Sequence, residues 1–283
     1  MTAVGTYRVH TLCVGELYLP HDGAIMRDPV HCWLVEDGTH RVLVDSGMPD
    51  IAEVRRTLKV GGTGGGHASL VTALAELDLK PSDIQYVVPT HLHFDHGSNL
   101  DLFPDACVVL QRDEILHAID SVPTQRIYYP RSIIIELLQR KRGTGLRLLD
   151  GDHLLLPGIQ LLKLPAHTPG MHVPVITTTR GKVALVSDLG DHYRYWFPAD
   201  RRATDHPKRF LADTFLASNI RSSGELEFIA AMKRVLEHAD IVVPAHDFRI
   251  PKRMPEEWFA IPDSTAGDLA HVPPPTAGTT PTR

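Results

Sequence analysis

Four side chains of metal-ligand type lie within six positions of the sequence. They form the pattern His-x-His-x-Asp-His and are His91, His93, Asp95 and His96. Imidazole and carboxylate groups are the usual nitrogen and oxygen ligands of zinc and related divalent ions, and four such groups close together would be costly in an apolar core. An isolated histidine predicts little, but this spacing predicts a metal site.

The run has room for more than one ion. It follows the apolar residues 86–88, which predict a short buried strand. In extended chain His91 and His93 project to one side, so both imidazoles can reach one ion at ~2.0–2.1 Å. Asp95 and His96 then point to a second position. Both positions need further donors from elsewhere in the chain.

Three more ligand-type residues, His167, Asp188 and His246, each come directly after an apolar stretch that predicts a strand. The carboxyl ends of strands are where α/β sheets place their chemistry. Asp188 is suited to bridge two ions, because a carboxylate has two oxygens and paired ions lie ~3.5–4 Å apart. A bridging hydroxide would complete both shells. Singly these residues favour a turn or surface role, but together with the run they predict one site.

Strands and helices alternate in two similar halves of the chain. Two amphipathic helices, 69–79 and 226–236, each precede a short buried strand. The glycine-rich stretch 61–66 lacks the Lys-Ser/Thr ending of a phosphate loop and favours a surface loop. This order predicts a layered α/β sandwich of two packed sheets with helices outside. The expected strands are 7–19, 30–35, 41–44, 84–88, 108–110, 158–164, 173–178, 182–186 and 241–243.

The composition limits the kinds of partner that we expect this protein to bind. The 283 residues are expected to form one hydrolase domain over 1–263. With 29 basic and 34 acidic residues the net charge is −5, which favours neither nucleic acid nor an anionic membrane. No long apolar run predicts a membrane span or leader, so we expect a cytoplasmic monomer or homodimer. Three scattered cysteines indicate neither a disulfide framework nor a zinc knuckle.

Three segments are predicted to be additions to this frame: 121–145, 189–221 and a Pro-rich, disordered tail over 264–283. The first two contain clustered aromatic residues, which could form walls around a substrate or could cover the core. These aromatic residues are Tyr128, Tyr129, Tyr193, Tyr195, Trp196 and Phe197.

The motifs THLHFDH, PAHTPG, VSDLG and PAHD occur in this order between residues 30 and 247, and together they resemble the metallo-β-lactamase fold. The resemblance implies a four-layer αβ/βα sandwich. It also implies how the ligands divide: His91, His93 and His167 would hold one metal, Asp95, His96 and His246 the other, and Asp188 would be shared.

Within that superfamily the chain resembles the N-acyl homoserine lactonases. The resemblance lies in PVHCWLV at 29–35, VDSGMP at 44–49, HLHFDHGSN from His91, and His246-Asp247. It implies opening of a lactone ring and a quorum-quenching activity. Two positions depart from the pattern of these enzymes. Asp191 stands where they have a catalytic tyrosine, and Met171 stands where they have a further histidine, with His172 one place later.

These residues predict a hydrolase that uses two zinc ions, although iron, manganese or cobalt would also fit such ligands. Water bound to zinc has its pKa lowered toward ~7, which supplies a hydroxide nucleophile for a lactone or ester carbonyl. Asp95 is expected to return a proton to the leaving alkoxide. Asp191, Tyr193 or His192 would orient the substrate, and Asp45 and Thr90 would fix the imidazole rings.

Other functions use the same ligands. A glyoxalase II-like thioesterase, an arylesterase, an organophosphate hydrolase or a phosphodiesterase would need the same metal site. A different class of function would be an iron-bearing redox protein, or a metal-binding module without turnover. His93 disfavours the redox protein, because the flavo-diiron members of the fold resemble a pattern with Glu at that place.

Overall fold

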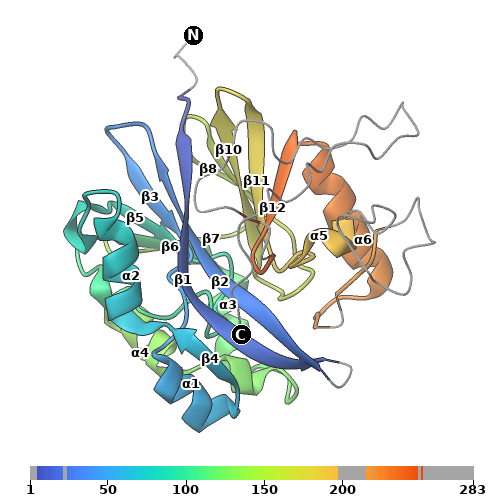
Figure 1. Ribbon diagram of the computed structural model, residues 1–283. Coiled ribbons are helices and arrows are strands. Elements are labelled where there is room, and N and C mark those ends of the chain that lie inside the picture. The colour runs from blue at the N-terminus through green and yellow to red at the C-terminus, as the bar shows by residue number, and fades with distance from the viewer. Residues whose placement is uncertain (1–4, 22–23, 197–214, 219, 248–249, 251–283) are drawn as a thin grey trace, which may run out of the picture.

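Two β-sheets packed face to face form the centre of the protein (Figure 1). The computed structural model describes residues 5–21, 24–196, 215–218, 220–247 and 250. The predicted tail 264–283 and most of the predicted addition 189–221 lie outside these residues.

The first sheet has seven strands in the order β4-β1-β2-β3-β5-β6-β7. The long strands β1 (Arg8–His21) and β2 (Ala24–Glu36) are antiparallel, and β2 pairs antiparallel with β3 (Arg41–Val44). From β3 the sheet continues in parallel through β5 (Tyr86–Val88), β6 (Cys107–Gln111) and β7 (Leu146–Leu149). The chain therefore leaves these four neighbouring strands at the same edge of the sheet.

The expectation of a surface loop over the glycine-rich stretch 61–66 is wrong for its first four residues. Gly61–Gly64 form strand β4, which pairs antiparallel with β1. A Cβ atom on Gly62 would lie 2.1 Å from the carbonyl oxygen of Glu16, so a strand here needs a residue without a side chain.

The second sheet has five strands in the order β12-β11-β10-β9-β8. The strands β8 (His153–Leu156), β9 (Ile159–Lys163), β10 (His172–Thr178) and β11 (Gly181–Ser187) are antiparallel to their neighbours, and β12 (Ile241–Pro244) runs parallel to β11. In the turn between β10 and β11, Gly181 has a φ of 110°. Strands β11 and β12 thus end side by side.

Helices cover the outer face of each sheet (Figure 1). Outside the first sheet lie α1 (Ile51–Leu58), α2 (Gly66–Ala75), α3 (Arg112–Ile119) and α4 (Arg131–Gln139). Outside the second lie α5 (Tyr193–Trp196) and α6 (Glu225–Leu236). Three short 3₁₀ helices, η1 (Pro81–Asp83), η2 (Leu100–Leu102) and η3 (Arg126–Tyr128), lie in the connections.

Alternating side chains of the first sheet enter two different apolar clusters. Trp33 and Val35 belong to the cluster between the sheets, while Leu34 and Leu43 belong to the cluster under α2 to α4. All four side chains are fully buried, and burying one contributes about 1.5–3 kcal/mol. The predicted four-layer αβ/βα sandwich is therefore confirmed, and it gives the strand ends a rigid base.

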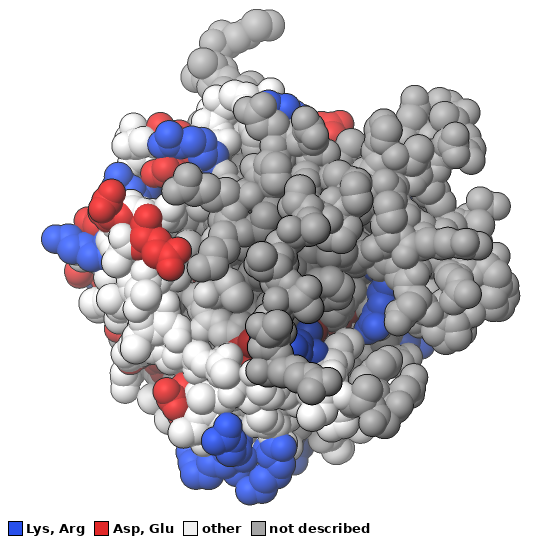
Figure 2. All heavy atoms as spheres, viewed as in Figure 1, with Lys and Arg blue, Asp and Glu red and all other residues white. Residues whose placement is uncertain are grey.

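On the face shown in Figure 2, the described residues carry charges of both signs. Figure 2 shows acidic and basic side chains interspersed on one side of the molecule, with a small basic group at the lower edge, over α1, which carries Arg55 and Arg56. Among the described residues, no helix is both long and apolar enough to cross a membrane.

Candidate metal centre

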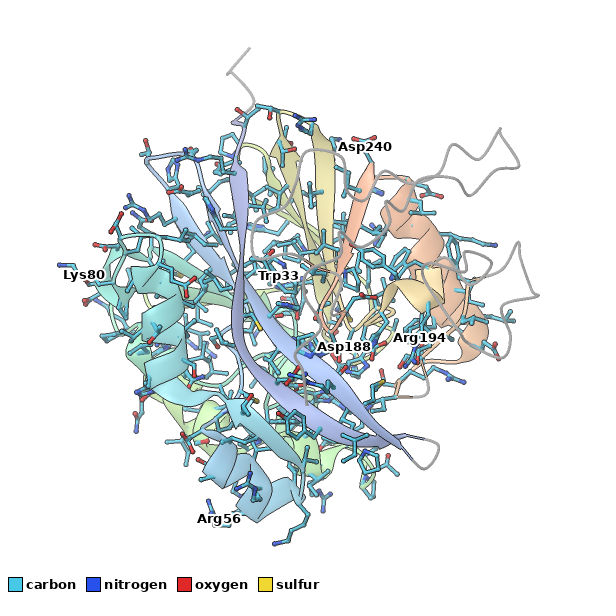
Figure 3. The ribbon with its side chains drawn as sticks, viewed as in Figure 1. Trp33, Arg56, Lys80, Asp188, Arg194 and Asp240 are labelled. Carbon is cyan, nitrogen blue, oxygen red and sulfur yellow. The ribbon has the colours of Figure 1, made fainter. Side chains whose placement is uncertain are left out.

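The predicted ligand residues meet at the carboxyl-terminal ends of the strands. His91, His93, Asp95 and His96 follow β5, and the other three follow β9, β11 and β12. Figure 3 labels Asp188 among the side chains gathered at the ends of these strands. The two sheets thus bring together residues that lie up to 155 positions apart, from His91 to His246.

Two groups of side chains have the spacing of metal ligands. We call His91, His93 and His167 the first ligand group, and Asp95, His96 and His246 the second. In each group the ligand atoms lie within 4.8 Å of one another. A carboxylate oxygen of Asp188 lies within the same distance of the ligand atoms of the first group. The division is the one that the family resemblance implies.

Asp188 lies between the two groups. Its Oδ2 atom is 3.2 Å from Nε2 of His167. Its Oδ1 atom is 3.2 Å from Nε2 of His96 and 3.3 Å from Nε2 of His246. One carboxylate oxygen therefore faces each group, which is the arrangement that a bridging ligand requires.

The donor set fits divalent metal ions. Nε2 of His91 is buried and has no hydrogen-bond partner among the described residues, which is costly for an atom that nothing binds. Two ligands of a tetrahedral zinc ion lie roughly 3.3 Å apart, given bonds of ~2.0–2.1 Å. The separations of 3.0 Å from Nδ1 of His93 to Nε2 of His167 and of 3.3 Å from Nε2 of His96 to Nε2 of His246 are close to that value.

Three of the imidazole rings are held by their second nitrogen. The Nδ1–H groups of His167 and His246 donate to the carbonyl oxygens of Ile220 and Pro29, at 2.7 and 2.9 Å. Nδ1–H of His96 donates to Oδ2 of Asp45 at 2.8 Å. Each bond leaves Nε2 as the atom facing the centre, which is how proteins commonly orient metal-binding histidines.

The predicted contacts of Asp45 and Thr90 are present. Besides accepting from His96, the buried Asp45 carboxylate accepts from the N–H and hydroxyl of Thr90, at 2.7 and 3.1 Å. The Thr90 hydroxyl also lies 3.2 Å from Nδ1 of His91 and 2.8 Å from the hydroxyl of Ser187. Asp45 and Ser187 both have left-handed backbone, with φ of 59° and 50°. Such strain in residues other than glycine is concentrated at functional sites.

The two ligand groups differ in their electrostatics. Burial, reinforced by neighbouring imidazoles, holds the pKa of His91 and of His93 well below the ordinary value. Burial also opposes the charge of His96 and His246, but nearby carboxylates outweigh it. Asp188 and Asp45 raise the pKa of His96 well above its usual range, and Asp28 and Asp188 raise the pKa of His246 to about 10.

Asp191 and His192 lie beside the second group. The main-chain oxygen of Asp191 accepts from the N–H of His246 at 2.9 Å, and its carboxylate is 3.4 Å from Nδ1 of His192. Nε2 of His192 lies 3.1 Å from Asp28 on β2. Burial opposes the charge of His192, but Asp191 and Asp28 raise its pKa to about 9. The Asp191 side chain is 24% exposed.

Tyr193 points into the fold. Its side chain is 1% exposed, and its hydroxyl donates to the carbonyl oxygen of Val242 at 3.1 Å. Its main-chain N–H donates to Asp247 at 2.9 Å. The next tyrosine, Tyr195, is only partly buried and has its ring 6.5 Å from that of His192. Of the two, Tyr195 is the more accessible from the side of Asp191.

The predicted addition 121–145 contacts the first group. The rings of Tyr128 and Tyr129 lie 5.2 and 4.8 Å from the ring of His93, and the N–H of Phe94 donates to the carbonyl oxygen of Tyr128 at 2.8 Å.

Met171 and His172, at the second position that departs from the lactonase pattern, are fully buried.

Two residues near the centre were not identified from sequence. The Asp28 carboxylate lies close to His192 and His246. The Glu114 carboxylate accepts a hydrogen bond from the N–H of Leu92, the residue between His91 and His93. Neither belongs to a histidine-rich motif, and each is one of 34 acidic residues. For Glu114 the available signal was its place at the end of LQRDE, directly before the inserted segment that resembles that of the lactonases.

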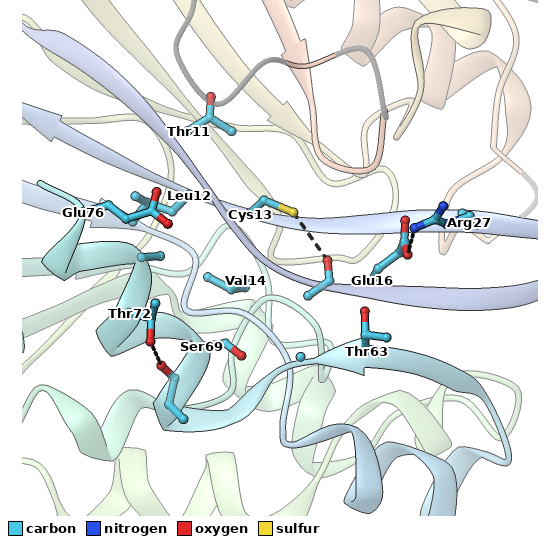
Figure 4. A pocket seen from close by; sticks show the side chains of 14 residues that line it. Thr11, Leu12, Cys13, Val14, Glu16, Arg27, Thr63, Ser69, Thr72 and Glu76 are labelled. Atoms are coloured by element: carbon cyan, nitrogen blue, oxygen red, sulfur yellow. Dashed lines mark hydrogen bonds and ion pairs between the residues drawn. The ribbon is translucent and has the colours of Figure 1, made fainter. Parts of the chain in front are cut away.

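A separate hollow of about 540 Å³ lies between β1, β4 and α2, and Figure 4 shows it from close by. Its charged side chains include Glu16 and Arg27, which form an ion pair at 2.6 Å. The hydroxyl of Thr72 donates to its own helix, at the carbonyl oxygen of Ala68. No set of ligand-type side chains converges here among the described residues, so the strand-end cluster is the candidate site.

Comparison with known protein families gives an independent result. The model of the Metallo-beta-lactamase superfamily matches residues 25–246. An N-acyl homoserine lactonase of Bacillus cereus is 31% identical over 173 residues, which are 58% of this chain and 65% of that protein. Metallo-beta-lactamase domain-containing protein 1 of Homo sapiens is 30% identical over 188 residues, which are 65% of this chain and 56% of that protein. The chain thus spans less than two thirds of either relative.

Solved structures agree on the fold. An N-acyl homoserine lactone hydrolase with N-hexanoyl-L-homoserine bound at its catalytic metal center superposes with a TM-score of 0.64 at 23% identity, covering 86% of this chain and 94% of that one. A probable metal-dependent hydrolase from Staphylococcus aureus gives a TM-score of 0.69 at 18% identity, covering 94% and 96%. At such low identities the likeness concerns architecture alone.

Proposed function

This chain belongs to the metallo-β-lactamase superfamily, and we propose that it is a dinuclear metal-dependent hydrolase that opens a lactone or cleaves a related ester bond. The observation that carries the proposal is the position of Asp188, with one carboxylate oxygen toward each of two ligand groups. A site for a single ion would not need a carboxylate between two sets of imidazoles.

In this proposal the first ligand group binds one ion, the second group binds the other, and Asp188 binds both. Zinc is the metal we expect, and iron, manganese or cobalt would fit the same nitrogen and oxygen ligands. When bound, such ions polarise a carbonyl group and lower the pKa of water, which supplies hydroxide at neutral pH.

The chain's own residues would orient the substrate and move the proton. Burial raises the pKa of Asp95 although His96 and His246 oppose the rise, so its carboxyl group is suited to carry a proton to the leaving alkoxide. The exposed edge of Asp191 would accept a hydrogen bond from the substrate. Tyr193 would serve to hold this segment in place, because its hydroxyl is bonded to Val242.

Lactones are the substrate class we favour because the relatives that match this chain include N-acyl homoserine lactonases. Asp191 changes the expected contact. A tyrosine can donate a hydrogen bond, whereas an ionised carboxylate only accepts, and His192 helps to lower the pKa of Asp191 against the effect of burial. We therefore expect substrates with an amide N–H or a hydroxyl near the scissile carbonyl.

The experiment is a substrate panel with metal-loaded protein. The panel contains acyl-homoserine lactones, simple γ-lactones, aryl esters, thioesters, phosphotriesters and phosphodiesters. We expect the highest kcat/KM on a lactone or oxygen ester, and loss of all turnover after chelation. Preference for a thioester or phosphoester would assign one of the other hydrolase activities, and turnover that survives complete metal removal would refute the proposal.

We further propose one hydrolase domain over residues 1–263, acting as a cytoplasmic monomer or homodimer in quorum quenching. Light scattering after gel filtration gives the oligomeric state, and fractionation of the source cells gives the location. A larger assembly or a membrane-associated fraction would contradict these expectations.

A further inference from the structure

Glu114 is a buried acidic residue that contacts neither ligand group through their side chains. It lies in the first turn of α3 and its side chain has no exposed surface. A carboxyl group in such a place is costly unless donors surround it. Glu114 accepts three hydrogen bonds, from the N–H of Leu92 at 2.9 Å, the hydroxyl of Tyr129 at 3.1 Å and the hydroxyl of Thr168 at 2.6 Å.

Two of the three donors belong to the loops that carry the first ligand group. Leu92 lies between His91 and His93, and Thr168 directly follows His167. These loops follow β5 of the first sheet and β9 of the second, so Glu114 connects the two sheets at the place where the ligands leave them. Oε1 holds one loop and Oε2 holds the other.

The loop after β9 is packed tightly against the same residue. A Cβ atom on Gly170 would lie 2.1 Å from the backbone nitrogen of Glu114 and 2.4 Å from its Cα. Only glycine allows this approach. The distance between the His167 loop and the start of α3 is therefore fixed by contact as well as by the Thr168 hydrogen bond.

The third donor connects the aromatic addition to the same point. The ring of Tyr129 packs on His93 at 4.8 Å while its hydroxyl reaches Glu114. Burial and the neighbouring Glu114 raise the pKa of Tyr129, so its hydroxyl stays protonated and able to donate. Among the described residues, Glu114 makes no hydrogen bond to Asp95, His96 or His246 of the second group.

We propose that Glu114 is a positioning residue that fixes the His91–His93 turn and the His167 loop at one separation, and thereby sets the metal affinity of the first ligand group without affecting the second. The inference rests on the metal-binding part of the proposed function and is independent of the substrate. Partners that orient metal ligands commonly change metal affinity 10–100-fold when they are lost.

The test measures binding of Co²⁺ by competition with a chelator, together with the visible spectrum of the bound metal. The variants are Glu114→Gln, Thr168→Val and, as matched control, Tyr129→Phe, which keeps the ring on His93 and both loop contacts. Variants His167→Ala and His246→Ala provide reference spectra in which one position is disabled. Thermal unfolding with chelator present shows that each variant is folded.

We expect Thr168→Val to weaken the first position by about 10–100-fold and to change its spectrum, with the second position within about threefold of the native protein. Glu114→Gln should give a smaller loss, because the amide oxygen can still accept from Leu92 while the amide nitrogen requires Thr168 to accept. Tyr129→Phe should bind both ions as the native protein does.

Unchanged affinity at the first position in folded Thr168→Val and Glu114→Gln would overturn the inference, as would equal losses at both positions, which indicate general loosening. A native protein that binds no metal would overturn the inference and the proposed function together. A native protein that binds two ions but hydrolyses nothing in the panel would refute the proposed function alone.

Discussion

The two ligand groups of the metal centre are built from similar residues but are supported in different ways. Apart from Asp188, which the two groups share, the imidazoles of the first group lie against neutral partners such as the Thr90 hydroxyl and the main-chain oxygen of Ile220. Burial lowers the pKa of His91 and of His93. The second group lies against carboxylates. Asp45 bonds to His96, and Asp28 lies 3.9 Å from His246.

This difference determines what each group does before a metal binds. Neutral imidazoles can accept an ion without losing a proton, whereas the elevated pKa values of His96 and His246 mean that an ion must displace protons there. In return, the carboxylates beside the second group make its histidines more basic and better ligands once a metal is bound. The following changes test this asymmetry, from the largest expected effect to the smallest.

Asp188→Ala removes the one ligand shared by both groups. We expect loss of hydrolysis by at least about 1,000-fold, equal to about 4 kcal/mol of transition-state stabilisation, and fewer than two metal ions per chain by elemental analysis. Asp240→Asn is the matched control, because Asp240 lies at the opposite end of the second sheet (Figure 3) and bonds to the N–H of Lys182. Full activity in Asp188→Ala would rule out a bridging role.

Asp45→Asn removes the charge behind His96 while keeping the shape of the side chain. The second position should bind metal about 10–100-fold more weakly, and the first should change less, because its imidazoles have other partners. Stepwise titration with Co²⁺ measures both affinities. The opposite order of losses would show that the carboxylate does not act mainly through the second group.

His172 is a further histidine whose pKa is lowered by burial, like His91 and His93 of the first ligand group. It is fully buried, and burial lowers its pKa to about 4. The unfolded chain, with a histidine pKa of about 6.5, takes up this proton first, so stability should fall as the pH drops from about 6.5 toward 4.

Between pH 7 and pH 5 the loss assigned to His172 is about 2 kcal/mol. Urea unfolding of metal-free protein should show this dependence in the native chain, and His172→Leu should be less sensitive to acid by that amount. The same pH dependence in both proteins would mean that the folded state accommodates the charged ring.

Tyr193→Phe gives the smallest expected effect. Loss of the hydroxyl that donates to Val242 should cost about 1 kcal/mol of unfolding free energy, with kcat within about twofold of the native value. Thermal unfolding and initial rates measure the two quantities. A fall in kcat of about 100-fold would instead place the hydroxyl on the substrate.

The sequence predicted the candidate ligand residues, which the fold brings together, better than it predicted the residues around them. Histidines and aspartates at strand ends are chemically distinctive, so the seven ligand candidates and the two-sheet frame were identified from residue type and spacing. The partners of these ligands are ordinary residues. Asp28 reaches His192 from another strand, and Ile220 and Pro29 contribute only main-chain oxygens, which no side-chain pattern can reveal.

Local patterns failed where the tertiary fold decides the outcome. The glycines of β4 were expected to form a surface loop because they lack the ending of a phosphate loop, yet their lack of side chains is what lets β4 approach β1. Tyr193 was a candidate catalytic residue because it lies close to Asp188 in sequence, and the turn that follows β11 instead directs its hydroxyl to Val242.

The most direct test of a two-ion hydrolase is the hydrolysis rate of an acyl-homoserine lactone as zinc is added to metal-free protein. We expect no turnover without metal, and a maximal rate only when two zinc ions are bound per chain. Turnover in the metal-free protein would contradict a metal-dependent hydrolase. A rate that is already maximal with one ion per chain would contradict the two-ion site around Asp188.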